Sequence, residues 1–157
     1  MELFMPLLET ISEHMKQAMK SRDKLRLETL RMIRAGLLEK QVEKRPTGGM
    51  TNEDEINVLI SASKKRKEAI DIYKQNGRED LADQEEKELQ IIQEYLPKQL
   101  TPLEVEQFIK TVINNEGATS QKDFGKIMSI VMKELKGKAE GKTIQENVKK
   151  LLGDTEK

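Results

Sequence analysis

The stretch EYLPKQLTPLE, residues 94–104, divides the chain and fixes its fold class. Pro97 cannot continue a helix and biases the residue before it away from helical geometry, so we place a boundary there. Directly afterwards, Thr101 supplies a capping hydroxyl, Pro102 stands at the first helical position, and Glu104 follows three residues after the cap. The stretch therefore predicts a helical region that ends near residue 97 and a second one that begins at residue 101.

Four helices are predicted before this boundary, because apolar residues recur there every three or four positions. Their approximate ranges are 6–20, 21–45, 51–75 and 79–96. Ser21 is expected to cap the second helix, and Thr51 with Asp54 is expected to form a capping box for the third. Gly77 is placed to end that third helix.

Three more helices are predicted after the boundary. The first begins at Thr101, the second begins at Ser120 and ends at Gly137, and the third begins at Thr143. The predicted fold class is therefore all-α. We expect a four-helix N-terminal domain, residues 1–97, followed by a three-helix C-terminal domain, residues 98–157.

The composition excludes several classes of protein. Charged residues make up 36% of the chain and aromatic residues 3%, a balance that suits exposed helices better than a sheet. Cysteine is absent, which rules out a disulfide framework, a thiolate nucleophile and a thiolate metal site. No stretch approaches the ~20 apolar residues of a membrane span, and the first residues lack a signal-peptide pattern. We therefore expect a cytoplasmic protein that does not associate with a membrane.

Four short blocks, spread over nearly the whole chain, carry a resemblance to a known family. They are LRM at 30–32, KRKEA at 65–69, EYLPKQL at 94–100, and the run from FGKIM at 124–128 to KGKAEG at 136–141. In these blocks the chain resembles the YqeY-like proteins of the GatB/YqeY family. Its C-terminal part is also similar to the tail domain of the B subunit of tRNA-dependent amidotransferases and to a domain of some glutaminyl-tRNA synthetases.

In both of those settings the domain helps to hold tRNA, so the resemblance implies a tRNA-binding accessory protein. Its expected partners are tRNA and an aminoacyl-tRNA synthetase or an amidotransferase. The resemblance also leaves open a carbon-nitrogen ligase activity with glutamine as the amido-N-donor. A third reading is a protein-interaction module whose amphipathic helices dock on a partner.

The residues offer little chemistry for an enzyme. His14 is the single histidine, borders the apolar stripe of its helix, and is more typical of a boundary residue than of a general base. The run GKAEGKT at 137–143 resembles a Walker A loop, but it has one residue too few between the glycines and follows a predicted helix instead of a strand. We therefore expect no catalytic residue, no metal site and no cofactor.

The same run favours binding of a phosphate of RNA. Lysines surround the expected helix start at Thr143, where free N–H groups and the helix dipole favour an anion. Two more lysines, seven positions apart, project from one side of the preceding helix. The candidate RNA-binding residues are Lys126, Lys133, Lys136, Lys138 and Lys142. The alternative is a flexible connection whose lysines only keep it soluble.

Charge is unevenly distributed along the N-terminal helices. Residues 16–34 contain seven basic residues against Asp23 and Glu28, whereas residues 79–94 contain seven acids opposed only by Lys87. Such a dipolar molecule would bind a polyanion in one orientation. The alternative is that these are solvated helix faces paired within the molecule.

Four charged residues fall inside the apolar stripes of the N-terminal helices. They are Arg34, Arg66, Glu85 and Glu88. A charge in a packing face needs a partner, so we expect these arginines and glutamates to meet as structural ion pairs between helices. The alternative is a polar pocket that binds a substrate.

Overall fold

The computed structural model of the protein describes residues 6–154 and contains α-helices and short 3-10 helices, with no strand in that range. The predicted all-α fold class is confirmed. The chain divides into two compact units, Met1–Leu96 and Pro97–Lys157, which are called unit 1 and unit 2 below. Unit 1 holds four of the α-helices and unit 2 holds three.

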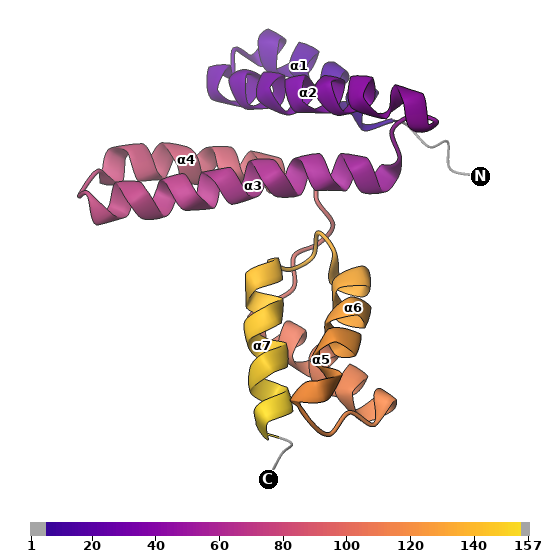
Figure 1. The fold of residues 1–157 in the computed structure, drawn as a ribbon. Helices are drawn as coiled ribbons and strands as arrows, with labels where there is room; N and C mark the ends of the chain where they lie inside the picture. The colour runs from indigo at the N-terminus through magenta and orange to yellow at the C-terminus, as the bar shows by residue number, and fades with distance from the viewer. Residues whose placement is uncertain (1–5, 155–157) are drawn as a thin grey trace. The chain divides into compact units, whose positions relative to one another are not determined.

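Unit 1 consists of two helical hairpins (Figure 1). One pairs α1 (Leu7–Ser21) with α2 (Lys24–Lys44), and the other pairs α3 (Asn52–Gln75) with α4 (Glu79–Gln93). The short 3-10 helix η1 (Arg45–Thr47) follows α2. Because α2 packs against both α3 and α4, the two hairpins share a core. Its buried residues are Ile11, Ala18, Leu30, Ile33, Leu37, Leu59 and Ile92.

Both predicted capping boxes are confirmed. Thr51 Oγ1 accepts a hydrogen bond from the Asp54 N–H at 3.1 Å, and Asp54 Oδ2 accepts one from the Thr51 N–H at 2.9 Å. The reciprocal pair at Thr101 and Glu104 has both distances at 3.2 Å and starts α5. Each box satisfies N–H groups that have no partner within the helix, so these starts are determined by residues three positions apart.

The predicted cap of α2 at Ser21 is wrong. Ser21 is the last residue of α1, and its hydroxyl donates to the Ala18 carbonyl oxygen at 3.2 Å. Arg22 adopts the left-handed conformation, with a φ of 59°, and ends α1. Asp23 then caps α2 by accepting a hydrogen bond from the Arg26 N–H at 3.1 Å. Because α1 continues through Ser21, that residue is not free to start the next helix.

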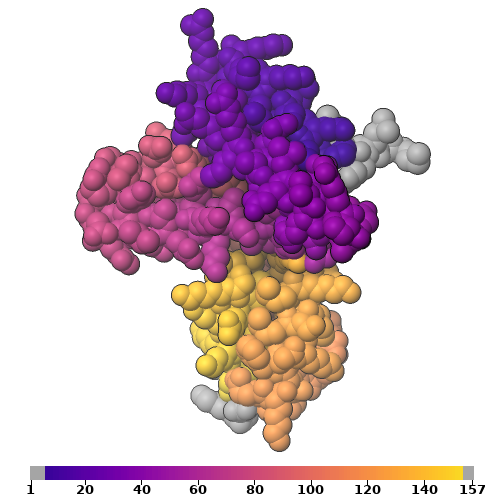
Figure 2. Space-filling model, turned by 45° about the horizontal axis from the view of Figure 1, so that its top comes forward, coloured from indigo at the N-terminus to yellow at the C-terminus, as the bar shows by residue number. Residues whose placement is uncertain are grey.

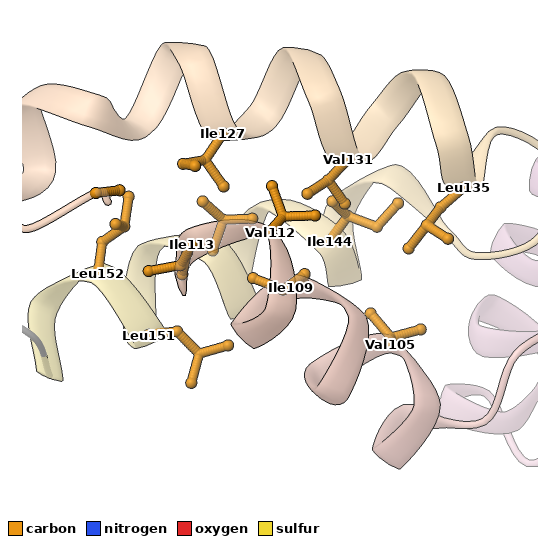
Figure 3. Packing of buried hydrophobic residues seen from close by; sticks show 12 residues of the cluster. Val105, Ile109, Val112, Ile113, Ile127, Val131, Leu135, Ile144, Leu151 and Leu152 are labelled. Carbon is orange, nitrogen blue, oxygen red and sulfur yellow. The ribbon is translucent and has the colours of Figure 1, made fainter. Parts of the chain in front are cut away.

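Unit 2 is a three-helix arrangement of α5 (Pro102–Glu116), α6 (Phe124–Leu135) and α7 (Gly141–Asp154). The 3-10 helix η2 (Gln121–Asp123) precedes α6. Figure 3 shows side chains from all three helices pointing into one interior. The buried side chains are mainly those of valine, isoleucine and leucine. Fully burying one such side chain contributes roughly 1.5–3 kcal/mol, so this interior is the main source of stability of unit 2.

Two helix starts in unit 2 differ from the prediction. Ser120 caps η2 instead of α6, because its hydroxyl accepts from the Lys122 N–H. α7 begins at Gly141, two residues before the predicted Thr143, because the Ile144 N–H already bonds to the Glu140 carbonyl oxygen at 3.0 Å. The first turn of α7 therefore includes the lysine at position 142.

Candidate nucleic-acid interface

The predicted RNA-binding lysines fall into two places in unit 2. Four of them lie between the carboxyl end of α6 and the first turn of α7, and we call them the α6–α7 lysines: Lys133, Lys136, Lys138 and Lys142. Lys126 instead lies in the first turn of α6, about 14 Å of helix rise from the end of that helix. Its Nζ is 3.1 Å from Glu116 Oε2, so it pairs with α5. The structure therefore separates Lys126 from the other four.

Residues 97–100 hold the α6–α7 connection in one conformation. Gln99 Nε2 donates to the Pro97 carbonyl oxygen at 2.9 Å and to the Gly137 carbonyl oxygen at 2.6 Å. The Leu100 N–H donates to the Lys138 carbonyl oxygen at 2.8 Å. Gly137 is buried and has a φ of 77°, a conformation that favours glycine. These contacts favour an ordered connection over the flexible one considered above.

Gln99 is a site residue that sequence reasoning missed. It bonds to a carbonyl 38 positions away, and no local pattern predicts such a contact. Its side-chain nitrogen joins the carbonyl oxygens of Pro97 and Gly137, and it positions the backbone next to Lys138. We regard Gln99 as a positioning residue for the α6–α7 lysines.

Exposed lysines lie next to the free N–H groups at the start of α7. Lys138 and Lys142 are exposed, and neither forms an ion pair within the part of the chain that the structure describes. The first N–H groups of α7 have no acceptor within the helix, and the helix dipole adds partial positive charge there. Glu140 is also exposed and places one negative charge between the two lysines. The arrangement suits a phosphate group that contacts both lysines.

Arg66 lies between two carboxylates of α4. Its Nη1 is 3.2 Å from Glu85 Oε2, and its Nε is 3.1 Å from Glu88 Oε2. The Nε contact is a charge contact and not an aligned hydrogen bond. Arg66 Nη2 also contacts the Met32 sulfur on α2. The guanidinium thus joins α3 to α4 and touches α2, which assigns it to the structure of unit 1.

Arg34 was expected to form an ion pair inside a packing face, but the structure shows no such pair among the described residues. It is exposed on α2, and its Nε donates to Ser12 Oγ of α1 at 3.4 Å. Glu85 and Glu88 are already occupied by Arg66. Arg34 lies at the edge of the α1–α2 contact, where its guanidinium reaches water, so this residue needs no carboxylate partner.

A polar cluster surrounds the end of α4. His14 Nδ1 and Tyr95 Oη are 2.6 Å apart, and Arg26 Nη2 donates to the same Tyr95 oxygen at 3.3 Å. Arg26 Nη1 is 2.8 Å from Glu94 Oε2. Burial raises the pKa of Tyr95, because it disfavours the phenolate, although the charge of Arg26 opposes the shift. Tyr95 is therefore a neutral phenol near pH 7, and His14 is hydrogen-bonded to its hydroxyl group.

Two kinds of feature are absent from the described residues. Within residues 6–153, no group of three or more histidine, aspartate or glutamate side chains is arranged to hold a metal ion. In the same part of the chain, none of the helices has the length and apolar character needed to cross a membrane. What the α6–α7 region can do chemically is bind an anion.

Comparisons with known proteins identify relatives over most of the chain. A family model described as "Yqey-like protein" matches residues 8–152. Three relatives share the name "Altered inheritance of mitochondria protein 41, mitochondrial". The one from Vanderwaltozyma polyspora is 33% identical over 127 residues, which is 74% of this chain and 66% of the relative.

The other two relatives are more distant. The protein of Eremothecium gossypii is 31% identical over 57% of this chain and 48% of its own length. The protein of Pyrenophora tritici-repentis is 26% identical over 93% of this chain and 81% of its own length. The matched part of this chain thus spans less than two thirds of the length of the first two relatives, at 66% and 48%.

Proposed function

Because the chain belongs to the YqeY-like protein family, we propose that it is a tRNA-binding accessory protein without a catalytic centre of its own. The first support is the similarity of residues 98–157 to the amidotransferase tail domain, which helps to hold tRNA. The second is that the α6–α7 lysines place positive charge on the surface of that same unit. The enzyme served would be an aminoacyl-tRNA synthetase or an amidotransferase.

The observation that carries the proposal is the anchored α6–α7 connection. The Gln99 side chain donates a hydrogen bond to the Gly137 carbonyl oxygen, and the Leu100 N–H donates one to the Lys138 carbonyl oxygen. The backbone of this connection is therefore ordered before any ligand binds. A preordered surface loses less conformational entropy on binding than a flexible one. The backbone positions of Lys138 and Lys142 are therefore set before binding, which suits recognition of a folded polyanion.

The composition favours contact with the RNA backbone over contact with bases. Aromatic residues make up only 3% of the chain, so stacking on unpaired bases contributes little. Contacts from lysine to phosphate carry little sequence information. The protein should therefore recognise tRNA by its shape and charge and should bind many tRNA species similarly.

Replacing both Lys138 and Lys142 with alanine is expected to weaken binding for every tRNA tested. Each lost phosphate contact lowers the slope of log affinity against log salt by roughly 0.7 to 0.9, so the double variant should lose about 1.4 to 1.8. Stability should hardly change, because both lysines are exposed. The measurement is the electrophoretic mobility of labelled tRNA across a salt series.

A matched control removes two exposed lysines elsewhere in unit 2. Lys122 precedes α6, and Lys149 lies in the second half of α7, so the variant with both changed to alanine has the same charge change. It should retain the salt slope of the unmodified protein. If Lys138→Ala with Lys142→Ala binds tRNA with unaltered affinity and slope, the α6–α7 lysines are not the interface.

We also expect that the purified protein neither hydrolyses glutamine nor consumes ATP, with or without tRNA. Hydrolysis of glutamine needs an activated nucleophile, and the chain has no cysteine and a single histidine, His14, which is bonded to Tyr95. Ammonia and phosphate release are measured against a buffer blank. Ammonia release that follows the protein through further purification would instead support the carbon-nitrogen ligase reading.

A further inference from the structure

We infer that the α1–α2 hairpin of unit 1 carries a second surface for the phosphate backbone of RNA. This inference rests on the proposed function, because it assigns a further contact surface to the same ligand. We call this surface the α1–α2 basic face. It consists of Lys16, Lys20, Arg22, Lys24, Arg31 and Arg34.

The cations of this face have no ion-pair partner among the residues that the structure describes. All six side chains are exposed, and within residues 6–153 none of them forms an ion pair. The neighbouring Arg26, by contrast, is held by Glu94 at 2.8 Å. Asp23, one of the two acids in this segment, is occupied as the cap of α2. Only the exposed Glu28 remains to oppose six cations within residues 16–34.

The two helices bring these cations together. The hydrogen bond from Arg34 to Ser12 shows how the two antiparallel helices align, so Arg31 lies roughly one turn further along, close to the level of Lys16. Lys24 lies seven positions before Arg31 and therefore on the same side of α2. Figure 2 shows long side chains standing out from this hairpin. The cations thus form a continuous surface that reaches the α1–α2 turn.

Acidic residues limit the face at one end. Glu9 and Glu13 lie in the first half of α1 and line a groove of about 440 Å³ together with Lys16 and Arg34. A polyanion that follows the basic face would be repelled at that end and attracted toward the turn. The charge arrangement therefore gives the contact a direction along the hairpin.

Arg22 supplies an independent observation. Within the described residues it is the one residue other than glycine with a positive φ, at 59°. Other turns after helices in this protein use glycine for that conformation, at Gly77, Gly117 and Gly137. Arginine is less favourable than glycine in this conformation because it has a Cβ atom. Strain of this kind is concentrated at functional positions.

The composition of the face favours RNA over a membrane. The exposed large apolar side chains within residues 16–34 are Met19, at 56%, and Met32, at 37%. A helix that lies in a lipid interface needs a broad apolar side to insert among the acyl chains. Six cations with one exposed methionine on each helix lack that side, whereas they suit a chain of phosphate groups.

The test compares two double variants in binding to labelled tRNA across a salt series. Lys24→Gln with Arg31→Gln removes two charges from the face, and Lys87→Gln with Lys122→Gln removes two exposed charges outside it. The first variant should lower the salt slope by roughly 1.4 to 1.8, and the second should leave it unchanged. Arg22→Gly should weaken binding while its denaturation midpoint stays the same or rises, because glycine relieves the backbone strain.

Each outcome bears on the inference. If the unmodified protein binds no tRNA, the proposed function fails and this inference fails with it. If Lys138→Ala with Lys142→Ala weakens binding but Lys24→Gln with Arg31→Gln does not, the proposed function stands and this inference is overturned. It is also overturned if Lys24→Gln with Arg31→Gln reduces binding to phosphatidylserine vesicles but leaves RNA binding unaltered. An Arg22→Gly protein with a lower midpoint and unchanged affinity would assign Arg22 to helix capping.

Discussion

Replacing Arg66 with alanine is expected to lower the free energy of unfolding of unit 1 by about 3 kcal/mol. The side chains of Arg66, Glu85 and Glu88 are only 20%, 16% and 14% exposed. Alanine would leave two carboxylates one turn apart on α4, poorly hydrated and repelling each other. Loss of one partner from a fully buried pair costs about 3 to 5 kcal/mol, and the remaining exposure places this site at the lower end.

Tyrosine fluorescence makes the measurement specific to unit 1. The chain contains no tryptophan and two tyrosines, Tyr73 and Tyr95, and both lie in that unit. Urea is the suitable denaturant, because guanidinium chloride would screen the ion pairs under test. The expected result is a lower urea midpoint for Arg66→Ala, with little change in the slope of the transition.

Two further variants test whether the lost ion pairs cause the destabilisation expected for Arg66→Ala. Arg34→Ala removes an exposed arginine of the same unit and should change stability by no more than about 0.5 kcal/mol. Adding Glu85→Gln and Glu88→Gln to Arg66→Ala should recover much of the loss, because no unpaired charge is then buried. An unchanged midpoint for Arg66→Ala would mean that the pair does not stabilise unit 1 and that Arg66 is available to a ligand.

Replacing Glu55 with alanine is expected to destabilise unit 1 by about 2 to 3 kcal/mol. Glu55 is 6% exposed in the first turn of α3, and its Oε2 accepts a hydrogen bond from the Leu7 N–H at 2.8 Å. Pro6, which precedes α1, supplies no side-chain cap. Glu55 therefore caps α1 from another helix, and alanine would leave the Leu7 N–H without this acceptor and remove the favourable contact with the helix dipole.

Hydrogen exchange tests the local part of this prediction. In Glu55→Ala the amides of α1 should exchange faster than those of α4, because the first turn of α1 loses its acceptor. Glu55→Gln is the matched control: its amide oxygen can accept the same bond, so the loss should be smaller than with alanine. Equal stability of Glu55→Ala and the unmodified protein would show that water replaces the carboxylate at no cost.

The candidate interface was partly accessible from the sequence. The lysines around Gly137 could be placed at a helix end, because the glycines and the apolar spacing of α6 and α7 are local signals. Lys126 was grouped with these lysines because it lies seven positions before Lys133, and its ion pair with Glu116 of α5 was not predicted. The bonds from Gln99 to Gly137 and from Leu100 to Lys138 could not be predicted, because they join segments far apart in the chain.

By itself the sequence determined the helices and two of their starts. The boxes at Thr51 and Thr101 depend on a side chain and an N–H three residues apart, so neighbouring residues suffice to specify them. The all-α fold class follows in the same way from apolar spacing and the breaks between helices.

Only the tertiary structure decided which charges are structural. Arg34 and Arg66 occupy similar positions in apolar stripes, yet Arg66 meets two carboxylates of α4 and Arg34 reaches water beside Ser12. Likewise, Glu55 caps a helix that begins 48 residues before it. Such contacts depend on how helices pack, and periodicity within one helix carries no information about the residue that the neighbouring helix places opposite.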